Sequence, residues 1–399
     1  MSFSEKIVRI RTRLFDFKFL LVLFAVLALF SSVQSYLNTR PEAYETGNCT
    51  KYNNYQIFQH AHFHLIEGKN LYQHHPEDYC DLFKYSPTFA LAFGSLAYFP
   101  DWLGITLWNL INALLLFWAI RRLPIPPEIS LSVAFFVALE MTTNMQNEQS
   151  NALMAGLMVL VFALLERKQF FWAMAALASV TYIKIFGFAL CALLLFYPSK
   201  VKNVLYLSVW MGLLFILPVL FTPFENLLQQ YVYWGELLKM DHDSTYQLSF
   251  MHGINAWFGL SLDRLMVALG GLILLLISIL KVYISKNDLP HRLMILSSLL
   301  MWVILFNHKA ESPTYIIAMV GVGIWYFLQE KNKWIFGLVI FAFIFTSLSP
   351  TDLFPKFIRI EIFRPLIVKA MGATLIWFKL WYDLMFGQIT FRKLNSSPL

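Results

Sequence analysis

The sequence predicts an all-α integral membrane protein with about 12 membrane helices. Hydrophobic residues make up 58% of its 399 residues and charged residues only 14%, with a mean hydropathy of +0.58. Soluble domains carry about a quarter charged residues. Apolar runs recur along the chain, and short polar segments rich in Lys and Arg separate them. The aromatic content of 17% fits side chains that sit at both bilayer interfaces.

The distribution of charge and motifs excludes two broad classes of function. The net charge of +7 comes from short basic clusters between apolar runs, which the positive-inside rule explains better than binding to nucleic acid. The sequence contains no Gly-rich phosphate loop, His-Glu-x-x-His motif or Gly-x-Ser-x-Gly motif. We therefore expect no nucleic-acid partner and no nucleotide-dependent chemistry on a soluble domain.

The first 84 residues predict a tail, a membrane helix and a long external loop. Residues 1–18 carry five basic residues against two acids and should form a cytoplasmic tail. Phe19 to Val33 should form the first membrane helix, because the run lacks the small-residue cleavage site of a signal peptide. Residues 38–84 follow as an external loop, which is too long to serve only as a connection.

Within this loop, Asn53 to Glu67 has the apolar stripe of an amphipathic helix that lies on the membrane, and Gly68 suits its end. His60 and His64 have the i, i+4 spacing of metal ligands, with Glu67 one turn further on. The group contains no cysteine and faces water, so we expect solvated histidines and no metal. Cys49 and Cys80 can pair if the loop lies in an oxidising compartment, and the sequence leaves this open.

Residues 85–390 predict a helix bundle that completes a single domain over residues 1–399. The apolar run at 86–99 is short, and we interpret it as a re-entrant or tilted half-span because it places Arg121 and Arg122 in the cytoplasm. The alternative is a true span, which leaves a tolerated Arg pair on the external side. The later basic segments then also lie in the cytoplasm. The polar segments at 146–151, 222–252, 307–312 and 349–358 face outward, where they can build one site at the external end of the bundle.

The polar segment 146–151 is the centre of this predicted site, because its side chains need partners at the rim of the hydrocarbon. Lys184 lies inside an apolar stretch and predicts an anionic partner, unless it snorkels from a helix end. His308, Lys309 and Glu311 can bind phosphate and position a proton carrier, or they form an ordinary interfacial loop. The acids around His242, in residues 239–244, fit a solvated loop better than a tuned base.

The order of these motifs resembles glycosyltransferase family 87, from about residue 50 to about residue 345. Its members are membrane enzymes of the GT-C superfamily that use polyprenyl-phosphate-linked sugars. The positions that carry the resemblance are Asn54 to Phe58, Gly68 with Leu71 and Tyr72, Tyr85-Ser86-Pro87, the segment Asn147-Glu148-Gln149-Ser150-Asn151, Lys184 and His308. The corresponding family motifs include Tyr-Pro-Pro and Asn-Gly-Gln-x-Asn, an intramembrane Lys and a late His.

Two departures from the family pattern affect the expected chemistry. Asn54 stands where the family has its proposed catalytic Asp, and an amide cannot accept the proton of an incoming hydroxyl. Glu148 stands at the Gly of the family motif and brings a carboxylate into the segment. The candidates for a replacement base are Asp81, Asp78, Glu45 and Glu148.

The resemblance implies an inverting glycosyltransferase that moves a mannose-like hexose or a pentose from a polyprenyl-phosphate donor. The acceptor is a hydroxyl of a glycan or glycolipid at the periplasmic face of the inner membrane, and the scheme requires no metal or other cofactor. The expected catalytic residues are Asn54, Asp81, Glu148 and His308, and the expected substrate-binding residues are Tyr85, Gln146, Gln149, Asn151, Lys184, Lys309 and Glu311. The alternatives are a transporter or flippase of a lipid-linked sugar and a catalytically inactive accessory homologue.

Overall fold

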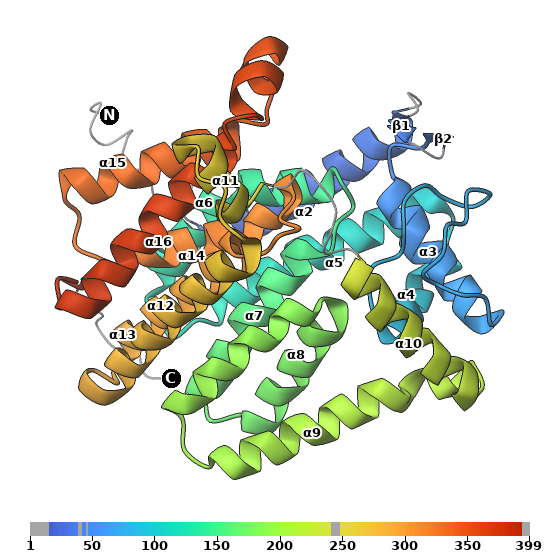
Figure 1. Ribbon diagram of the computed structural model, residues 1–399, viewed down its shortest axis with the longest axis horizontal. Coiled ribbons are helices and arrows are strands. Elements are labelled where there is room, and N and C mark those ends of the chain that lie inside the picture. Colours follow the sequence, from blue (N-terminus) through green and yellow to red (C-terminus); the bar gives the residue numbers. More distant parts are fainter. Residues whose placement is uncertain (1–15, 39–41, 45–46, 241–247, 393–399) are drawn as a thin grey trace.

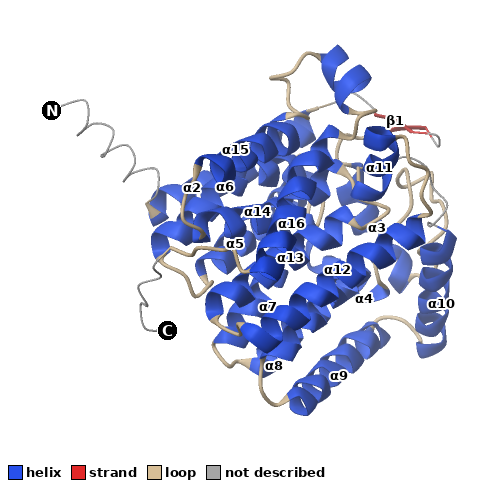
Figure 2. Ribbon diagram, turned by 60° about the vertical axis from the view of Figure 1, so that its left-hand side comes forward, coloured by secondary structure: helices blue, strands red, loops and turns tan. Residues whose placement is uncertain are grey.

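The computed structural model describes residues 16–38, 42–44, 47–240 and 248–392, and nearly all of its regular structure is helical (Figures 1 and 2). The first half of the chain contains α2 (Phe17–Leu37), β1 (Glu42–Tyr44), β2 (Gly47–Cys49), α3 (Asn53–Ile66), α4 (Pro87–Ala97), α5 (Asp101–Arg121), α6 (Pro127–Met145), α7 (Asn151–Glu166), α8 (Phe170–Ile183) and η1 (Ile185–Phe196). The two short strands pair in antiparallel fashion.

The second half continues with helices that complete the bundle and its edge. They are α9 (Lys200–Ile216), η2 (Leu217–Leu220), α10 (Phe224–Met240), α11 (Phe250–Phe258), α12 (Arg264–Ser285), α13 (Leu289–Leu305), η4 (Ser312–Thr314), α14 (Tyr315–Leu328), α15 (Lys333–Ala342), η5 (Phe343–Leu348), η6 (Ile358–Phe363) and α16 (Val368–Phe386). The segment around η6 projects from one end of the bundle in Figure 1.

Small residues let the central helices approach closely. The core pairs α5 with α7, α13 with α14, and α14 with α6, while α2 covers α5. A Cβ atom at Gly156 of α7 would lie 3.1 Å from the backbone of Leu116 on α5, and one at Gly321 of α14 would lie 2.7 Å from the carbonyl oxygen of Ser297 on α13. Membrane helices associate through such close backbone approach, because lipid removes the hydrophobic drive between them.

Four helices are long and apolar enough to cross a bilayer: α2, α5, the continuous segment Lys200–Leu220, and α12. Seven further apolar helices have 10–17 residues, short of the roughly 20 that a span needs. The prediction of about 12 full-length membrane helices is therefore not confirmed within the described residues. One reason is that apolar runs are interrupted, as at Lys184, where an extended residue separates α8 from η1.

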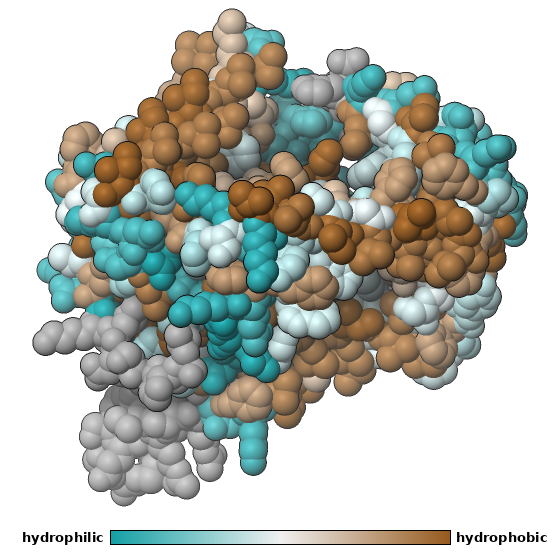
Figure 3. Space-filling view, turned by 90° about the horizontal axis from the view of Figure 1, so that it is seen from below, coloured by the Kyte–Doolittle hydropathy of each residue, from teal (hydrophilic) through white to brown (hydrophobic). Residues whose placement is uncertain are grey.

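The hydrophobic surface fits a membrane protein. Val22, Leu205 and Ile273, on α2, α9 and α12 respectively, are each more than half exposed. α9 lies at the periphery of the bundle in Figures 1 and 2, and Figure 3 shows broad hydrophobic areas on one face of the molecule. Such surface is costly in water and is satisfied by lipid.

The basic segments predicted to be cytoplasmic contact one another at one end of the bundle. The guanidinium of Arg167 donates to the carbonyl oxygen of Arg122 at 2.5 Å, and Arg292 forms a two-pronged ion pair with Glu166 at 2.7 and 2.9 Å. The backbone N–H of Arg392 donates to Leu328 at 3.0 Å. Several of the basic segments that were expected to lie in the cytoplasm are thus neighbours in the structure.

The predicted helix of the external loop is also observed, as α3. Gly68 follows it with a φ of +72°, the left-handed conformation that favours glycine at a helix end. The short run at 86–99 becomes α4, whose 11 residues extend only about 16 Å. Such a helix is shorter than the hydrocarbon is thick, as are the other six short apolar helices.

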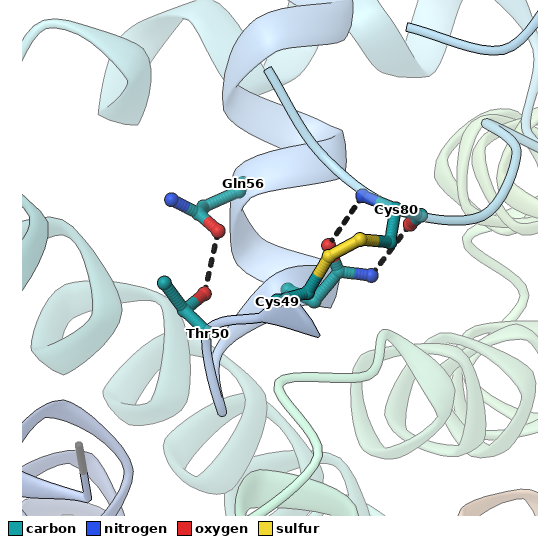
Figure 4. The surroundings of a disulfide bond; sticks show 5 residues. Cys49, Thr50, Gln56 and Cys80 are labelled. Carbon is teal, nitrogen blue, oxygen red and sulfur yellow. Dashed lines mark hydrogen bonds between the residues drawn. A yellow bond between two sulfur atoms is a disulfide. The ribbon is translucent and has the colours of Figure 1, made fainter. Parts of the chain in front are cut away.

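A disulfide between Cys49 and Cys80 closes the loop that contains α3 (Figure 4). The side chain of Asn53, at the start of α3, donates to the carbonyl oxygen of Cys80 at 2.6 Å and accepts from its N–H at 2.9 Å. The chain segment that leads into the predicted site is therefore bonded covalently to the end of β2, just before α3, and is held to α3 itself by two hydrogen bonds.

Candidate functional site

A cavity of about 400 Å³ gathers side chains from six separate parts of the chain. α3, the segment before α4, the turn between α6 and α7, the break after α8 and the segment between α13 and α14 all contribute to it. Eight of the predicted site residues line this cavity: Asn54, Asp81, Tyr85, Gln149, Lys184, His308, Lys309 and Glu311. Trp234 and Leu238 of α10 add an apolar wall.

The polar lining of the cavity is rich in cations. Lys84, Lys184 and Lys309 carry positive charge, and His308 can carry it when protonated. Asp81 and Glu311 are the two carboxylates among the described lining residues. A small cavity with this surplus of positive charge is suited to an anion such as a phosphate ester.

Side chains of neighbouring helices fasten the turn between α6 and α7 through its carbonyl oxygens. Asn54 donates to the carbonyl oxygen of Asn147 at 2.9 Å, Trp108 to that of Glu148 at 2.8 Å, and Asn144 to that of Gln149 at 2.9 Å. A buried turn cannot leave these oxygens without donors, so its conformation depends on this set of side chains.

Tyr85 connects this turn to the start of α4. Its hydroxyl donates to Oε1 of Gln149 at 3.1 Å, and its carbonyl oxygen accepts from the hydroxyl of Tyr72 at 2.8 Å. Ser86 then caps α4 by accepting from the N–H of Phe89, and Pro87 occupies the first turn. In the sequence Tyr-Ser-Pro, the tyrosine therefore places its ring in the cavity wall, and the serine and proline begin α4.

Lys184 reaches the cavity because the helix breaks there. It ends α8 with an extended backbone, and its Nζ donates to Oδ1 of Asn151 at 3.2 Å. The ammonium also lies 5.2 Å from the ring centroid of Tyr85. These contacts, with a neutral amide oxygen and an aromatic ring, hold the ammonium of Lys184 at the cavity.

Comparison with known proteins decides the family. The model of glycosyltransferase family 87 matches residues 83–306, which is more than half of the chain. The chain belongs to glycosyltransferase family 87. It is thus a membrane glycosyltransferase by family, and the predicted resemblance is confirmed.

Among solved structures, the chain is similar to ArnT from Cupriavidus metallidurans in the apo state, with 16% identity and a TM-score of 0.37. The alignment covers 92% of this chain and 77% of ArnT. A search of curated proteins gave no match.

The backbone explains why the family 87 motif has glycine at position 148. Glu148 has a φ of +46°, in the left-handed region that glycine adopts without a steric penalty. Its side chain is fully buried and is not part of the cavity lining. The structure thus places this expected catalytic carboxylate behind the wall of the cavity.

Gln146 and Asn151, which were expected to bind the substrate, also lie outside the cavity lining. Gln146 donates from its side chain to Gln34 of α2 at 2.6 Å, and Asn151 is fully buried and contacts the cavity only through Lys184. Of the other candidate bases, Asp78 binds histidines of α3, whereas Glu45 and the acids at 241 and 243 lie outside the described residues.

Asp81 sits at the cavity in a strained backbone conformation, with a φ of +72°. Its Oδ1 accepts from the N–H of Leu82 at 2.7 Å and lies 3.2 Å from the ammonium of Lys84. The backbone N–H of Leu82 and the ammonium of Lys84 are both hydrogen-bond donors, so the carboxylate of Asp81 is already hydrogen-bonded in this structure.

Glu311 borders two cavities. The second cavity, of about 430 Å³, is lined partly by Arg359, Arg364 and Lys369. Among the residues that the structure describes, Glu311 alone lines both it and the first cavity. A separate groove of about 300 Å³ runs beside α4, α5, α7 and α8 and is mainly apolar. Phe89 lines this groove, and its ring stacks on that of Tyr85 at 4.7 Å between centroids.

The histidines of α3 are more buried than the sequence predicted. His62 and His64 are 3% and 1% exposed, so the expectation of solvated histidines is wrong for both. Burial lowers the pKa of each imidazole. His60 and His64 face Asp78 rather than Glu67, because the loop folds back over α3.

Sequence reasoning missed Lys84, Asn307 and Trp234 among the cavity residues. Lys84 directly precedes the Tyr-Ser-Pro motif, and Asn307 directly precedes His308, so position in the chain offered a signal for both. Trp234 lies in the segment 222–252, which was expected to face the site, but no motif singled out this side chain.

Proposed function

We propose that this family 87 member transfers a hexose or pentose from a polyprenyl-phosphate donor to a hydroxyl of a glycan or glycolipid, with inversion at the anomeric carbon. The observation that carries the proposal is the convergence of Lys84, Lys184, His308 and Lys309 on one cavity. A lipid-phosphate leaving group gains negative charge as it departs, and a cluster of preplaced cations stabilises that charge.

In this scheme the bond between the anomeric carbon and the phosphate oxygen breaks while the acceptor oxygen attacks from the opposite face. The bonding electron pair leaves with the phosphate, beside Lys184 and Lys309. The proton of the acceptor hydroxyl passes to a carboxylate. Gln149 and Tyr85 are placed to contact the sugar, since both line the cavity and their hydrogen bond holds them together.

We assign the base role to Glu311. Asn54 cannot serve, because its amide holds the carbonyl oxygen of Asn147 and has no basic oxygen. Asp81 is engaged by Leu82 and Lys84. Glu311 stands between the two cavities, so an acceptor in the second cavity can present its hydroxyl to a donor in the first.

The apolar groove beside α4 suits the polyprenyl chain. Ile183 and Tyr182 line the groove, and Lys184, the next residue, lines the cation-rich cavity. A donor can therefore bind with its phosphate at Lys184 and its chain in van der Waals contact with Phe89, Phe93 and Leu157.

Two observations support a site on the periplasmic face of an inner membrane. The Cys49–Cys80 disulfide lies in the segment that leads to the cavity, and such bonds persist in oxidising compartments. The basic segments meet in contacts such as Arg167 with Arg122, and none of those described lines the cavity. Basic loops stay in the cytoplasm, which leaves the cavity on the other side.

The test is transfer from radiolabelled polyprenyl-phosphate sugars, screened over several sugars, in membranes that contain the wild type, Glu311→Gln or Asp81→Asn. We expect Glu311→Gln to lose at least about 100-fold in rate. Asp81→Asn should lose less, and Glu330→Gln, an exposed control on a basic segment, should match the wild type. Equal rates for Glu311→Gln and wild type would remove Glu311 as the base. A donor that binds to the wild type without transfer would instead favour a transporter or an accessory homologue.

A further inference from the structure

Two histidines of α3 and one aspartate of the following loop form a compact group outside the cavity. His60 and His64 are one helical turn apart and therefore share a face of α3. Nδ1 of His60 lies 3.5 Å from Oδ1 of Asp78, and Nε2 of His64 lies 2.8 Å from Oδ2 of the same carboxylate. The three ligand atoms that these residues offer lie within 4.8 Å of one another.

These distances are close to those of a metal site. Zn²⁺ binds imidazole nitrogen and carboxylate oxygen at about 2.0–2.2 Å, so neighbouring ligands in a tetrahedral site lie about 3.4 Å apart. The distances from the Asp78 carboxylate to the nitrogens of His60 and His64 both lie within about 0.6 Å of this ligand-to-ligand distance. Small rotations of the side chains are enough to place an ion between them.

The surroundings restrict these side chains. His64 is 1% exposed, and its ring lies 3.9 Å from that of His75 and 5.8 Å from that of Tyr79. Asp78 is held nearby because Cys80, two residues further on, is bonded to Cys49 just before α3 and accepts and donates hydrogen bonds with Asn53 of α3. His60 is about one-third exposed, which leaves a path for an ion from solvent.

We propose that His60, His64 and Asp78 bind a divalent transition-metal ion of the zinc class, which clamps the loop of residues 68–84 onto α3. Water or Glu77, whose side chain is 62% exposed, completes the coordination. Nitrogen ligands with one carboxylate select Zn²⁺ and its neighbours over Ca²⁺ and Mg²⁺, which prefer all-oxygen sites. The ion has a structural role: it holds the loop of residues 68–84, and this loop ends in two residues that line the cavity, Asp81 and Lys84.

The experiment uses the full-length protein in detergent, stripped with a chelator, and measures Zn²⁺ binding by competition with a chromophoric chelator. The metal content is measured by mass spectrometry after desalting. We expect one ion per chain in the wild type. His60→Ala and Asp78→Asn should each weaken binding at least about 100-fold, since loss of a supporting contact alone costs 10–100-fold. His74→Ala, an exposed histidine of the same loop, should bind as the wild type does.

A second measurement distinguishes loss of the site from loss of the fold. Zn²⁺ should slow protease cleavage within residues 68–84 of the wild type and of His74→Ala, but not of Asp78→Asn, while all variants keep the Cys49–Cys80 disulfide. No binding by the wild type, or equal binding by wild type and the double variant His60→Ala with Asp78→Asn, would overturn the proposal. Neither measurement depends on sugar transfer, so the result is independent of the proposed function.

Discussion

Nζ of Lys184 lies 3.2 Å from Oδ1 of Asn151 and donates a hydrogen bond to it, which links the end of α8 to the first residue of α7. Asn151 is fully buried, so it acts as a fixed acceptor that aims the ammonium at the cavity. The last position of the family motif and the intramembrane lysine thus work as a pair.

This pair leads to the first prediction. Lys184→Met should lower the rate of sugar transfer by about 100- to 1,000-fold, because the leaving phosphate loses a preplaced cation. Asn151→Leu should lower the rate of transfer by only about tenfold, because the Lys184 ammonium remains but is no longer held in position. Both are measured in the membrane transfer assay, with the exposed Lys202→Met as the matched control. A larger loss for Asn151→Leu than for Lys184→Met would contradict this order.

A second prediction concerns the backbone at position 148. Glu148→Gly and Glu148→Ala remove the same carboxylate, but only alanine retains the steric cost of a positive φ. We expect Glu148→Gly to be more stable than Glu148→Ala by about 1 kcal/mol, measured by thermal unfolding in detergent. Glu148→Gly should also keep the rate of sugar transfer within about threefold of the wild type. Loss of transfer in a well-folded Glu148→Gly would restore Glu148 as a catalytic candidate.

A third prediction concerns a buried ion pair between α6 and α16. The ammonium of Lys369 lies 2.6 Å from Oε1 of Glu140, and the two side chains are 5% and 0% exposed. Glu140→Gln should cost about 3–5 kcal/mol of stability, because it leaves a buried charge without its counterion. Replacing both residues by leucine should recover most of this loss. Thermal unfolding checks both, and equal stability of Glu140→Gln and wild type would contradict the expectation.

The fourth prediction is about the loop closed by the disulfide. Replacing Cys49 and Cys80 by serine opens a loop with a sequence separation of 31. The chain-entropy relation for such a loop gives a destabilisation of about 3–4 kcal/mol. Limited proteolysis should then cut residues 50–84 much faster, while Cys191→Ser, which removes the free cysteine, should leave the pattern unchanged.

The apolar groove gives a fifth prediction. Leu157→Trp should fill part of the roughly 300 Å³ groove and raise the KM for a long-chain polyprenyl donor about tenfold. A donor with a short lipid should be affected much less, since it does not extend along the groove. Leu160→Trp, one turn further along α7 and outside the groove, is the control. Equal effects on both donors would place the lipid elsewhere.

The sequence determined the class of the protein, because local patterns are enough for this. Apolar run length and basic clusters indicate membrane helices and their order, and the end of α3 follows from Gly68 alone. The motif positions also predicted eight lining residues of the cavity, since each motif lies where an apolar run ends.

The tertiary structure decided which polar residues face the cavity. Gln146 and Gln149 are three residues apart, yet one binds Gln34 and the other lines the cavity, because the turn at Glu148 has a left-handed residue that ends the helical register. The position of Glu311 between two cavities depends on segments far apart in sequence, and that of Asp78 between two histidines depends on how the loop folds back onto α3. Local pattern carries no information on such contacts, because they arise only when the helices pack.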